Sequence, residues 1–314
     1  MFVTLTLNPA IDQTVTVEAP LSIGSVCKVT AETRTPGGKG VNVAKMIAAN
    51  GKSVTAGGLL GQDDLRFYER TLTPAGIACR FLTVPFATRT NTMLTDGAGH
   101  ELKLNQSGFP GLEFHEASLL SYATSLTEMG TVVVLSGSLP VQFPADTYAR
   151  LIRLFCKAGC ATVLDTSDAA LAAGLAAKPD VIKPNRRELE GLLNRRLTSN
   201  HDVQETLRDL MTRHEVIVMS DGPDGAWFAS RGKILFATSP EVARVDTTGA
   251  GDTLLGQFCA DYFPARIMTS EIAARAVAAG AAAVEQPGTP IIDARRVQDL
   301  AAIVKVSSGK IDPP

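Results

Sequence analysis

The segment VDTTGAGDTLLGQF at 245–258 has the composition of a phosphate-binding helix start. Gly249 and Gly251 flank Ala250, and glycines allow a ligand to approach the backbone closely. The free N–H groups of a first helical turn form an anion site that the helix dipole reinforces. Asp252 follows directly, and a carboxylate there could accept a proton from a hydroxyl group that attacks phosphorus. Phosphoryl transfer needs such an anion site, so Asp252 is a candidate general base and the amides of Gly249, Ala250 and Gly251 are a candidate anion hole.

The same residues also fit an ordinary helix start, because Asp is a favoured N-cap residue. A second glycine-rich helix start, TPGGKGVNVAKMIA at 35–48, favours the catalytic interpretation. It is not a Walker A loop, since GK[ST] does not occur at the required spacing. Gly37 and Gly38 would let a polar ligand lie against the backbone, and Asn42 would project from the first helical turn. The alternative for this segment is a tight turn before a core helix.

Short β-rich runs alternate with helical segments along most of the chain. We expect strands at 3–7, 54–61, 131–137, 161–165, 180–183 and 215–220, and helices that include 41–50, 145–159 and 186–193. This alternation predicts right-handed βαβ crossovers and a mostly parallel sheet. Residues 12–34 and 88–105 alternate polar and apolar positions, which is typical of antiparallel strands with one wet face. We therefore expect one α/β domain over 1–314, with a small β lid built from those two segments.

The composition restricts the class of protein. The chain of 314 residues is 45% hydrophobic and 20% charged, as in ordinary globular proteins. A net charge of -2 argues against nucleic-acid binding, and no apolar run is long enough for a transmembrane helix. Neither nucleic acid nor a membrane is therefore an expected partner. The opening MFVTLTLNPAID predicts a strand and not a signal peptide, and the five cysteines contain no CxxC pair, so we expect a cytoplasmic protein.

Five motifs, in order along the chain, resemble those of the PfkB/ribokinase family of carbohydrate kinases. They are TLNPAID (6–12), GGKGVN (37–42), SGSLP (136–140), KPNRREL (183–189) and TTGAGD (247–252). The first is similar to the opening strand of the phosphosugar branch of the family. The resemblance implies a ribokinase-like three-layer α/β fold with a mostly parallel central sheet and a small β-sheet lid. It also implies transfer of a phosphoryl group from ATP to a sugar hydroxyl.

The resemblance implies roles for individual residues as well. On the sugar side it implies contacts from Asp12, Gly37, Gly38, Lys39, Asn42 and Ser138. On the nucleotide side it implies contacts from Lys183, Asn185, Ser220, Gly222, Gly225 and Thr248. Asn185 and Glu188 would organise Mg²⁺ through water, because Mg²⁺ keeps much of its hydration. The alternatives are a Pro turn before an exposed helix face for 183–189 and a simple β-turn for 220–225.

Two cations in the expected lid bear on the substrate. Arg89 and Lys103 match lid positions that hold the substrate phosphate in the phosphosugar branch. A bidentate contact from an arginine would discriminate against sugars without a phosphate. The alternative is two solvated charges on an exposed face. Because the second face of the lid would otherwise be exposed sheet, we also expect a homodimer formed through the lid.

The resemblance favours fructose 1-phosphate as the acceptor among three ketose phosphates. Lys39 in GGKG is similar to kinases of fructose 1-phosphate and tagatose 6-phosphate. NQSGF (105–109) and KPNRREL (183–189) resemble kinases of fructose 1-phosphate. Fructose 6-phosphate is the third candidate. The segment DTTGAGD (246–252) is similar to that of ribokinases. This resemblance leaves open whether a monovalent cation binds at Asp246 and Thr248. A kinase of nucleosides or unphosphorylated sugars, and a non-catalytic sugar-phosphate sensor, are the remaining alternatives.

Overall fold

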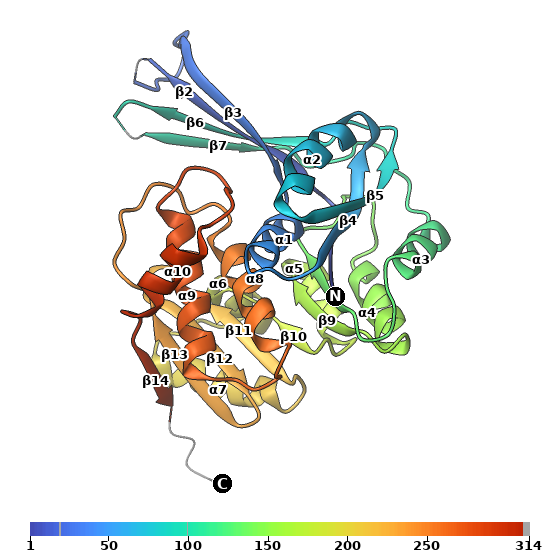
Figure 1. The fold of residues 1–314 in the computed structure, drawn as a ribbon, viewed down its shortest axis with the longest axis vertical. Coiled ribbons are helices and arrows are strands. Elements are labelled where there is room, and N and C mark those ends of the chain that lie inside the picture. Colours follow the sequence, from blue (N-terminus) through green and yellow to red (C-terminus); the bar gives the residue numbers. More distant parts are fainter. Residues whose placement is uncertain (19, 99, 310–314) are drawn as a thin grey trace.

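The computed structural model describes residues 1–18, 20–98 and 100–309. Within these residues, ten strands form one large sheet and four form a small separate sheet (Figure 1). The large sheet contains β1 (Phe2–Thr6), β4 (Val54–Gly61), β5 (Ile77–Val84), β8 (Val132–Ser136), β9 (Ala161–Asp165), β10 (Val181–Ile182), β11 (Val216–Ser220), β12 (Gly225–Ser230), β13 (Lys233–Thr238) and β14 (Val306–Gly309). Their order across the sheet is β14-β13-β12-β11-β10-β9-β8-β1-β4-β5.

Neighbouring strands from β11 to β5 are parallel. The run VVVLS in β8 is buried at every position, as expected for a parallel strand with helices on both faces. Strands β12, β13 and β14 are antiparallel, which the sequence analysis did not anticipate. The connection from β11 to β12 is one short turn around Gly222–Asp224, whereas a parallel crossover needs about a dozen residues.

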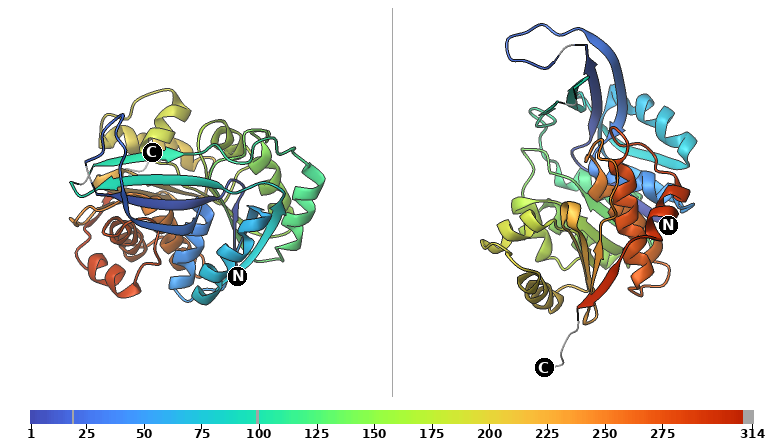
Figure 2. Two further views of the ribbon diagram at one scale, coloured as in Figure 1. Left: turned by 90° about the horizontal axis from the view of Figure 1, so that it is seen from above. Right: turned by 90° about the vertical axis from the view of Figure 1, so that its left-hand side faces the viewer.

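Helices cover both faces of the large sheet, which confirms the predicted three-layer arrangement (Figure 2). One layer consists of α1 (Lys39–Ala49), α2 (Leu65–Leu72), α8 (Ala250–Tyr262), α9 (Ser270–Val284) and α10 (Ala294–Ala301). The other consists of α3 (Glu116–Ser125), α4 (Thr147–Lys157), α5 (Asp168–Leu175), α6 (Arg186–Leu193) and α7 (Asn200–Met211). Short 3-10 turns lie at η1 (Gln62–Asp64), η2 (Thr73–Ala75) and η3 (Gly222–Asp224). No helix in the described part of the chain has the length and apolar character to span a membrane.

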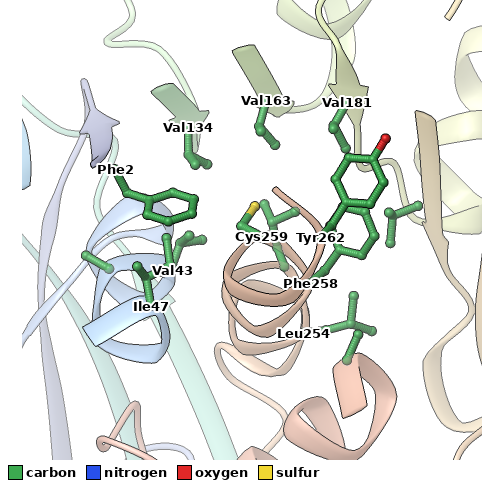
Figure 3. Close-up of a cluster of buried hydrophobic side chains, with 14 of the residues drawn as sticks. Phe2, Val43, Ile47, Val134, Val163, Val181, Leu254, Phe258, Cys259 and Tyr262 are labelled. Atoms are coloured by element: carbon green, nitrogen blue, oxygen red, sulfur yellow. The ribbon is translucent and has the colours of Figure 1, made fainter. Parts of the chain in front are cut away.

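Helices α1 and α8 are anchored side by side in the hydrophobic core. Figure 3 shows Val43 of α1 and Phe258 and Cys259 of α8 in the same cluster as Val134 and Val163 of the sheet. Full burial of such a side chain stabilises the fold by about 1.5–3 kcal/mol. Because both helices are held by this packing, their N-termini keep a fixed position relative to the ends of the strands.

The small sheet has the order β3-β2-β6-β7 and extends beyond the core in Figure 1. Its strands are β3 (Val29–Gly37), β2 (Ala10–Val17), β6 (Arg89–Asp96) and β7 (Glu101–Asn105). Strand β2 pairs antiparallel with β3 and parallel with β6. The register places Asp12, Asn91 and Asn105 in one row across the sheet, so these three side chains share a face.

Candidate active site

A cleft of about 1020 Å³ lies between the small sheet and the N-termini of α1 and α8. Ligands of open α/β sheets commonly bind at such a position beyond the carboxyl ends of the strands. The residues predicted for the sugar that line this cleft are Asp12, Gly38, Lys39, Asn42 and Arg89. The residues predicted for the nucleotide that line it are Lys183, Asn185, Ser220, Gly222, Gly225 and Thr248. Segment 249–252 lines the cleft between these two groups.

Gly37 lies behind Asp12 and is not among the residues that line the cleft. A Cβ atom at Gly37 would overlap the carboxylate of Asp12, so a larger residue would displace that carboxylate. Asn91 donates a hydrogen bond from Nδ2 to Asp12 Oδ1 at 3.0 Å. Burial raises the pKa of Asp12, whereas this hydrogen bond and the nearby Lys45 ammonium favour the ionised carboxylate. Asp12 is thus a partly desolvated acceptor with a fixed direction.

Asp252 is not the N-cap of α8, so that alternative interpretation is wrong. The N-cap is Gly249, whose φ of 75° is a conformation that glycine adopts without strain. Gly249 has no side chain with which to cap this helix, and the first N–H groups of any helix lack partners within it. The Ala250 N–H makes one long contact, 3.4 Å to the Thr247 carbonyl oxygen. Asp252 instead accepts a hydrogen bond from Asn42 Nδ2 at 2.9 Å. The amides predicted to form the anion hole and the Asp252 carboxylate therefore lie together at one end of α8.

Burial raises the pKa of Asp252 to about 6. The Lys39 ammonium opposes this rise and the Asp165 carboxylate adds to it. A carboxylic acid with a pKa near neutrality accepts a proton more readily than one with an ordinary pKa, yet it is still mostly ionised at pH 7. The electrostatics of Asp252 therefore suit a general base.

Asp165 is a buried charged residue beside the cleft that the sequence analysis missed. It ends β9, and its buried Oδ1 lies 3.3 Å from Lys39 Nζ and 3.1 Å from Lys183 Nζ. Ser136 Oγ donates to its other oxygen at 2.9 Å. Burial by itself would raise the pKa of Asp165, but the Lys183 and Lys39 ammoniums outweigh burial and hold it below its ordinary value. The sequence feature that could have indicated this residue is an Asp at the end of the apolar run ATVLD, where a parallel strand ends beside the cleft.

Arg89 is held by backbone carbonyl groups at the edge of the cleft. Its guanidinium donates to the carbonyl oxygens of Asn8 at 3.2 Å, Pro9 at 3.2 Å and Gln106 at 2.9 Å. Asn8, a second residue that the sequence analysis missed, donates from Nδ2 to Ser138 Oγ at 3.1 Å. Ser138 lies outside the lining of the cleft itself, and Asn8 ties it to the end of β1.

Lys103 contacts the segment that precedes α8. Its ammonium lies 3.2 Å from Asp246 Oδ1 and 3.3 Å from Thr248 Oγ1, outside the lining of the cleft. Asp246 also accepts hydrogen bonds from the backbone N–H groups of Thr248 and Gly288, each at 2.9 Å. Lys103 therefore links the small sheet to the turn that carries the anion hole.

Asn185 and Glu188 form a capping box at the start of α6. Asn185 Oδ1 accepts from the Glu188 N–H, and Glu188 Oε2 accepts from the Asn185 N–H, both at 2.8 Å. The structure therefore contains the helix start that was the alternative interpretation of 183–189. Glu188 Oε1 takes no part in the capping box and stays available to a ligand. Among the described residues no three His, Cys, Asp or Glu side chains gather into a metal cluster. Asn185 lines the cleft, whereas Glu188 does not. Mg²⁺ commonly takes one or two protein ligands plus phosphates and water, and the oxygen atoms of this pair are of the kind that it prefers.

The chain belongs to the pfkB family of carbohydrate kinases, whose sequence model matches residues 5–294. The 1-phosphofructokinase of Vibrio cholerae is 34% identical over 310 residues, which is 98% of this chain and 96% of that protein. The 1-phosphofructokinase of Rhodobacter capsulatus is 37% identical over 257 residues, which is 80% of each chain. Phosphofructokinase-2 from Escherichia coli, solved with potassium, has a TM-score of 0.88 and 28% identity, with 96% of this chain and 98% of that chain covered. The predicted family and its ribokinase-like fold are confirmed.

Proposed function

We propose that this protein transfers the γ-phosphoryl group of ATP to fructose 1-phosphate and releases fructose 1,6-bisphosphate and ADP. The observation that carries the proposal is the buried Asp252 carboxylate beside the uncapped first turn of α8, inside one cleft. The 1-phosphofructokinases from two bacteria, at 34% and 37% identity, support the choice of sugar. Lys39 in the GGKG motif supports it as well.

The reaction follows from the arrangement of these groups. A hydroxyl oxygen of the sugar forms a bond to the γ-phosphorus while the bond from that phosphorus to the bridging oxygen of ADP breaks. Asp252 takes the hydroxyl proton. The N–H groups of Gly249, Ala250 and Gly251 stabilise the negative charge that spreads over the transferred oxygens. Positioning and charge stabilisation supply most of the catalysis in such transfers.

We propose that Asp12, Gly38 and Asn42 orient the sugar hydroxyls, with Gly37 leaving room for Asp12. Arg89 would hold the sugar phosphate. Lys39 and Ser138 stay predicted contacts of the sugar substrate. Lys103 stays a predicted second cation for that phosphate, and it would have to leave Asp246 to reach it. We propose the small sheet as a lid, because closure over the sugar would exclude water from the reacting phosphoryl group.

We propose that Lys183, Ser220, Gly222, Gly225 and Thr248 contact the nucleotide, with Asn185 and Glu188 near its phosphates. Mg²⁺ bound through water at this pair would neutralise charge on ATP. A monovalent cation at Asp246 and Thr248 stays a prediction. Both residues contact Lys103 in this chain, and the Escherichia coli neighbour was solved with potassium. The cytoplasm stays the predicted location.

The decisive experiment measures kcat/KM with ATP and each of three acceptors: fructose 1-phosphate, fructose 6-phosphate and tagatose 6-phosphate. We expect fructose 1-phosphate to be preferred by at least about tenfold. A higher kcat/KM for fructose 6-phosphate would make that sugar the acceptor instead; a structural neighbour with TM-score 0.87 was solved with it. Turnover with ribose or adenosine alone would indicate a different kinase class, and binding without turnover would indicate a sensor.

The kcat/KM of the reaction should decline as the pH falls through about 6. The pKa of Asp252 in the free protein is raised to about 6, so below that pH the carboxyl group carries a proton and cannot accept another. A pH profile of kcat/KM measures this decline, because kcat/KM reports the pKa values of the free enzyme. An unchanged kcat/KM well below pH 6 would exclude Asp252 as the base.

We also propose a homodimer formed through the outer face of the small sheet. Leu102 and Leu104 are 50% and 52% exposed and lie on the sheet face opposite Asp12. Arg substitution of both leucines should convert the dimer to a monomer in sedimentation experiments, because it places charge in an apolar interface. Val141→Arg, at a remote position with 76% exposure, is the matched control and should stay dimeric. A monomeric wild-type protein at micromolar concentration would contradict the proposal.

A further inference from the structure

Lys45 is a buried lysine to which the proposed reaction gives no role. It is 5% exposed and lies one helical turn after Asn42 on α1. Its ammonium donates to the carbonyl oxygens of Pro36 and Thr289, each at 2.8 Å, and to Thr289 Oγ1 at 3.2 Å. It also lies 3.4 Å from Asn42 Oδ1. A buried charge is costly unless its hydrogen bonds are satisfied, and these contacts satisfy those of Lys45. We therefore asked what the buried ammonium does at this position.

The ammonium of Lys45 joins two segments that border the cleft from different sides. Pro36 lies at the end of β3, directly before the glycines of the sugar side. Thr289 lies between α9 and α10, and its methyl group sits over the backbone of Gly249, where a Cβ atom would be 2.8 Å away. The next residue back, Gly288, donates to Asp246. Lys45 thus holds a sugar-side strand and a segment beside the anion hole against α1.

Lys45 also decides which end of the Asn42 side chain faces the general base. A lysine ammonium only donates hydrogen bonds, so it can contact the oxygen of the Asn42 amide and not its NH₂ group. With the oxygen turned toward Lys45, the NH₂ group must face Asp252, and it does so at 2.9 Å. A rotated amide would place NH₂ against the ammonium and oxygen against the carboxylate. Both contacts would then be repulsive.

We propose that Lys45 is a positioning residue for phosphoryl transfer, which acts by fixing the Asn42 amide so that Asp252 stays ionised and aimed at the acceptor hydroxyl. This inference rests on the proposed function of Asp252 as the base. The charge of Lys45 acts in the same direction as its hydrogen bonds. Burial lowers the pKa of Lys45 to about 8, and attraction to Asp12 and Asp252 opposes that change. By the same attraction, the cation favours the ionised form of Asp252.

The first test compares Lys45→Met, which removes the charge, with Lys45→Arg, which keeps it. We expect Lys45→Met to lower kcat by about 10–100-fold, because a misplaced base can cost that much. The KM values for both substrates should stay within about threefold, and Lys45→Arg should recover most of the lost kcat. Lys52→Met, an exposed lysine just beyond α1, is the matched control and should behave as wild type. A Lys45→Met enzyme with wild-type kcat would overturn the inference.

The second test asks whether Lys45 acts through Asn42. If it does, Asn42→Ala combined with Lys45→Met should be no slower than Asn42→Ala alone, since the second change has nothing left to disturb. If the kcat losses of Asn42→Ala and Lys45→Met multiply in the double variant, and Lys45→Arg recovers no kcat, the role of Lys45 is merely structural and the inference is overturned. Far-ultraviolet circular dichroism and urea midpoints report folding. Should Lys45→Met fail to fold, Lys45→Gln keeps N–H donors without the charge and takes its place in both tests.

The pH profile reports the pKa of Asp252, which a general loss of rigidity in the structure would not change. Asp252 is faced by Asn42 and Lys39 from α1, by Asp165 from β9 and by Lys183 after β10. Loss of the Lys45 cation should raise the pKa of Asp252, so the decline of kcat/KM on the acid side should move to higher pH. An unmoved decline in a folded, slow variant would overturn the inference. If Asp252→Asn keeps full activity, the proposed function fails first; if only the Lys45 variants behave as wild type, the inference alone fails.

Discussion

Replacement of Asp252 by Asn should lower kcat by about 10²–10⁴-fold, the range for loss of a general base. Asn has nearly the same shape as Asp and its side-chain oxygen can still accept from Asn42 Nδ2, so the local geometry should survive. What it cannot do is take the hydroxyl proton. ATP binding should stay nearly intact, because most of the proposed nucleotide contacts come from the segments at the ends of β10 and β11.

Two measurements separate catalysis from binding in the Asp252→Asn variant. A coupled assay for ADP gives kcat, and the fluorescence of Trp227, the only tryptophan of the chain, reports nucleotide binding. Trp227 Nε1 donates to Asp221 at 3.3 Å, and Asp221 lines the cleft. Asp261→Asn is the matched control, since this carboxylate lies farther along α8 and pairs with Arg275 at 2.9 Å. Normal turnover in Asp252→Asn would refute the catalytic assignment.

Replacement of Arg89 by Ala should raise the KM for fructose 1-phosphate by about 10–100-fold, the size expected when one charged hydrogen-bond partner is lost. The kcat at saturation should change less, because Arg89 lies away from the anion hole. Any slow turnover of fructose without a phosphate should be unaffected, since that sugar offers the guanidinium no anion. An unchanged KM for fructose 1-phosphate would remove Arg89 from the phosphate site.

The hydrogen bonds of Arg89 call for two further variants. Because Arg89 also holds the carbonyl groups of Asn8, Pro9 and Gln106, the Ala variant could loosen the small sheet. Arg89→Lys keeps the charge but loses the planar fork, and we expect an intermediate KM. Arg34→Ala is the matched control, since this exposed arginine of the same sheet has its guanidinium 5.9 Å from the centre of the Phe67 ring. Its KM should be that of the wild type.

Local sequence patterns determined much of this protein. The alternation of apolar runs and helical segments predicted the parallel sheet and its two helical layers, because strand and helix periods depend only on neighbouring residues. The polar–apolar alternation at 88–105 predicted strands of the small sheet for the same reason. The glycines before Asp252 predicted one helix start, and the resemblance of five motifs in order along the chain indicated the family.

Only the tertiary structure decided how charges meet inside the cleft. Asp165 lies between Lys39 and Lys183, and Lys45 reaches Thr289 from 244 positions away. These pairs depend on β9 lying beside β10 and on the packing of α1 against α8. A period of two or 3.6 residues places a side chain on a face of its own element. It carries no information about which distant element will face that side chain, and burial then makes the resulting charge pairs strong.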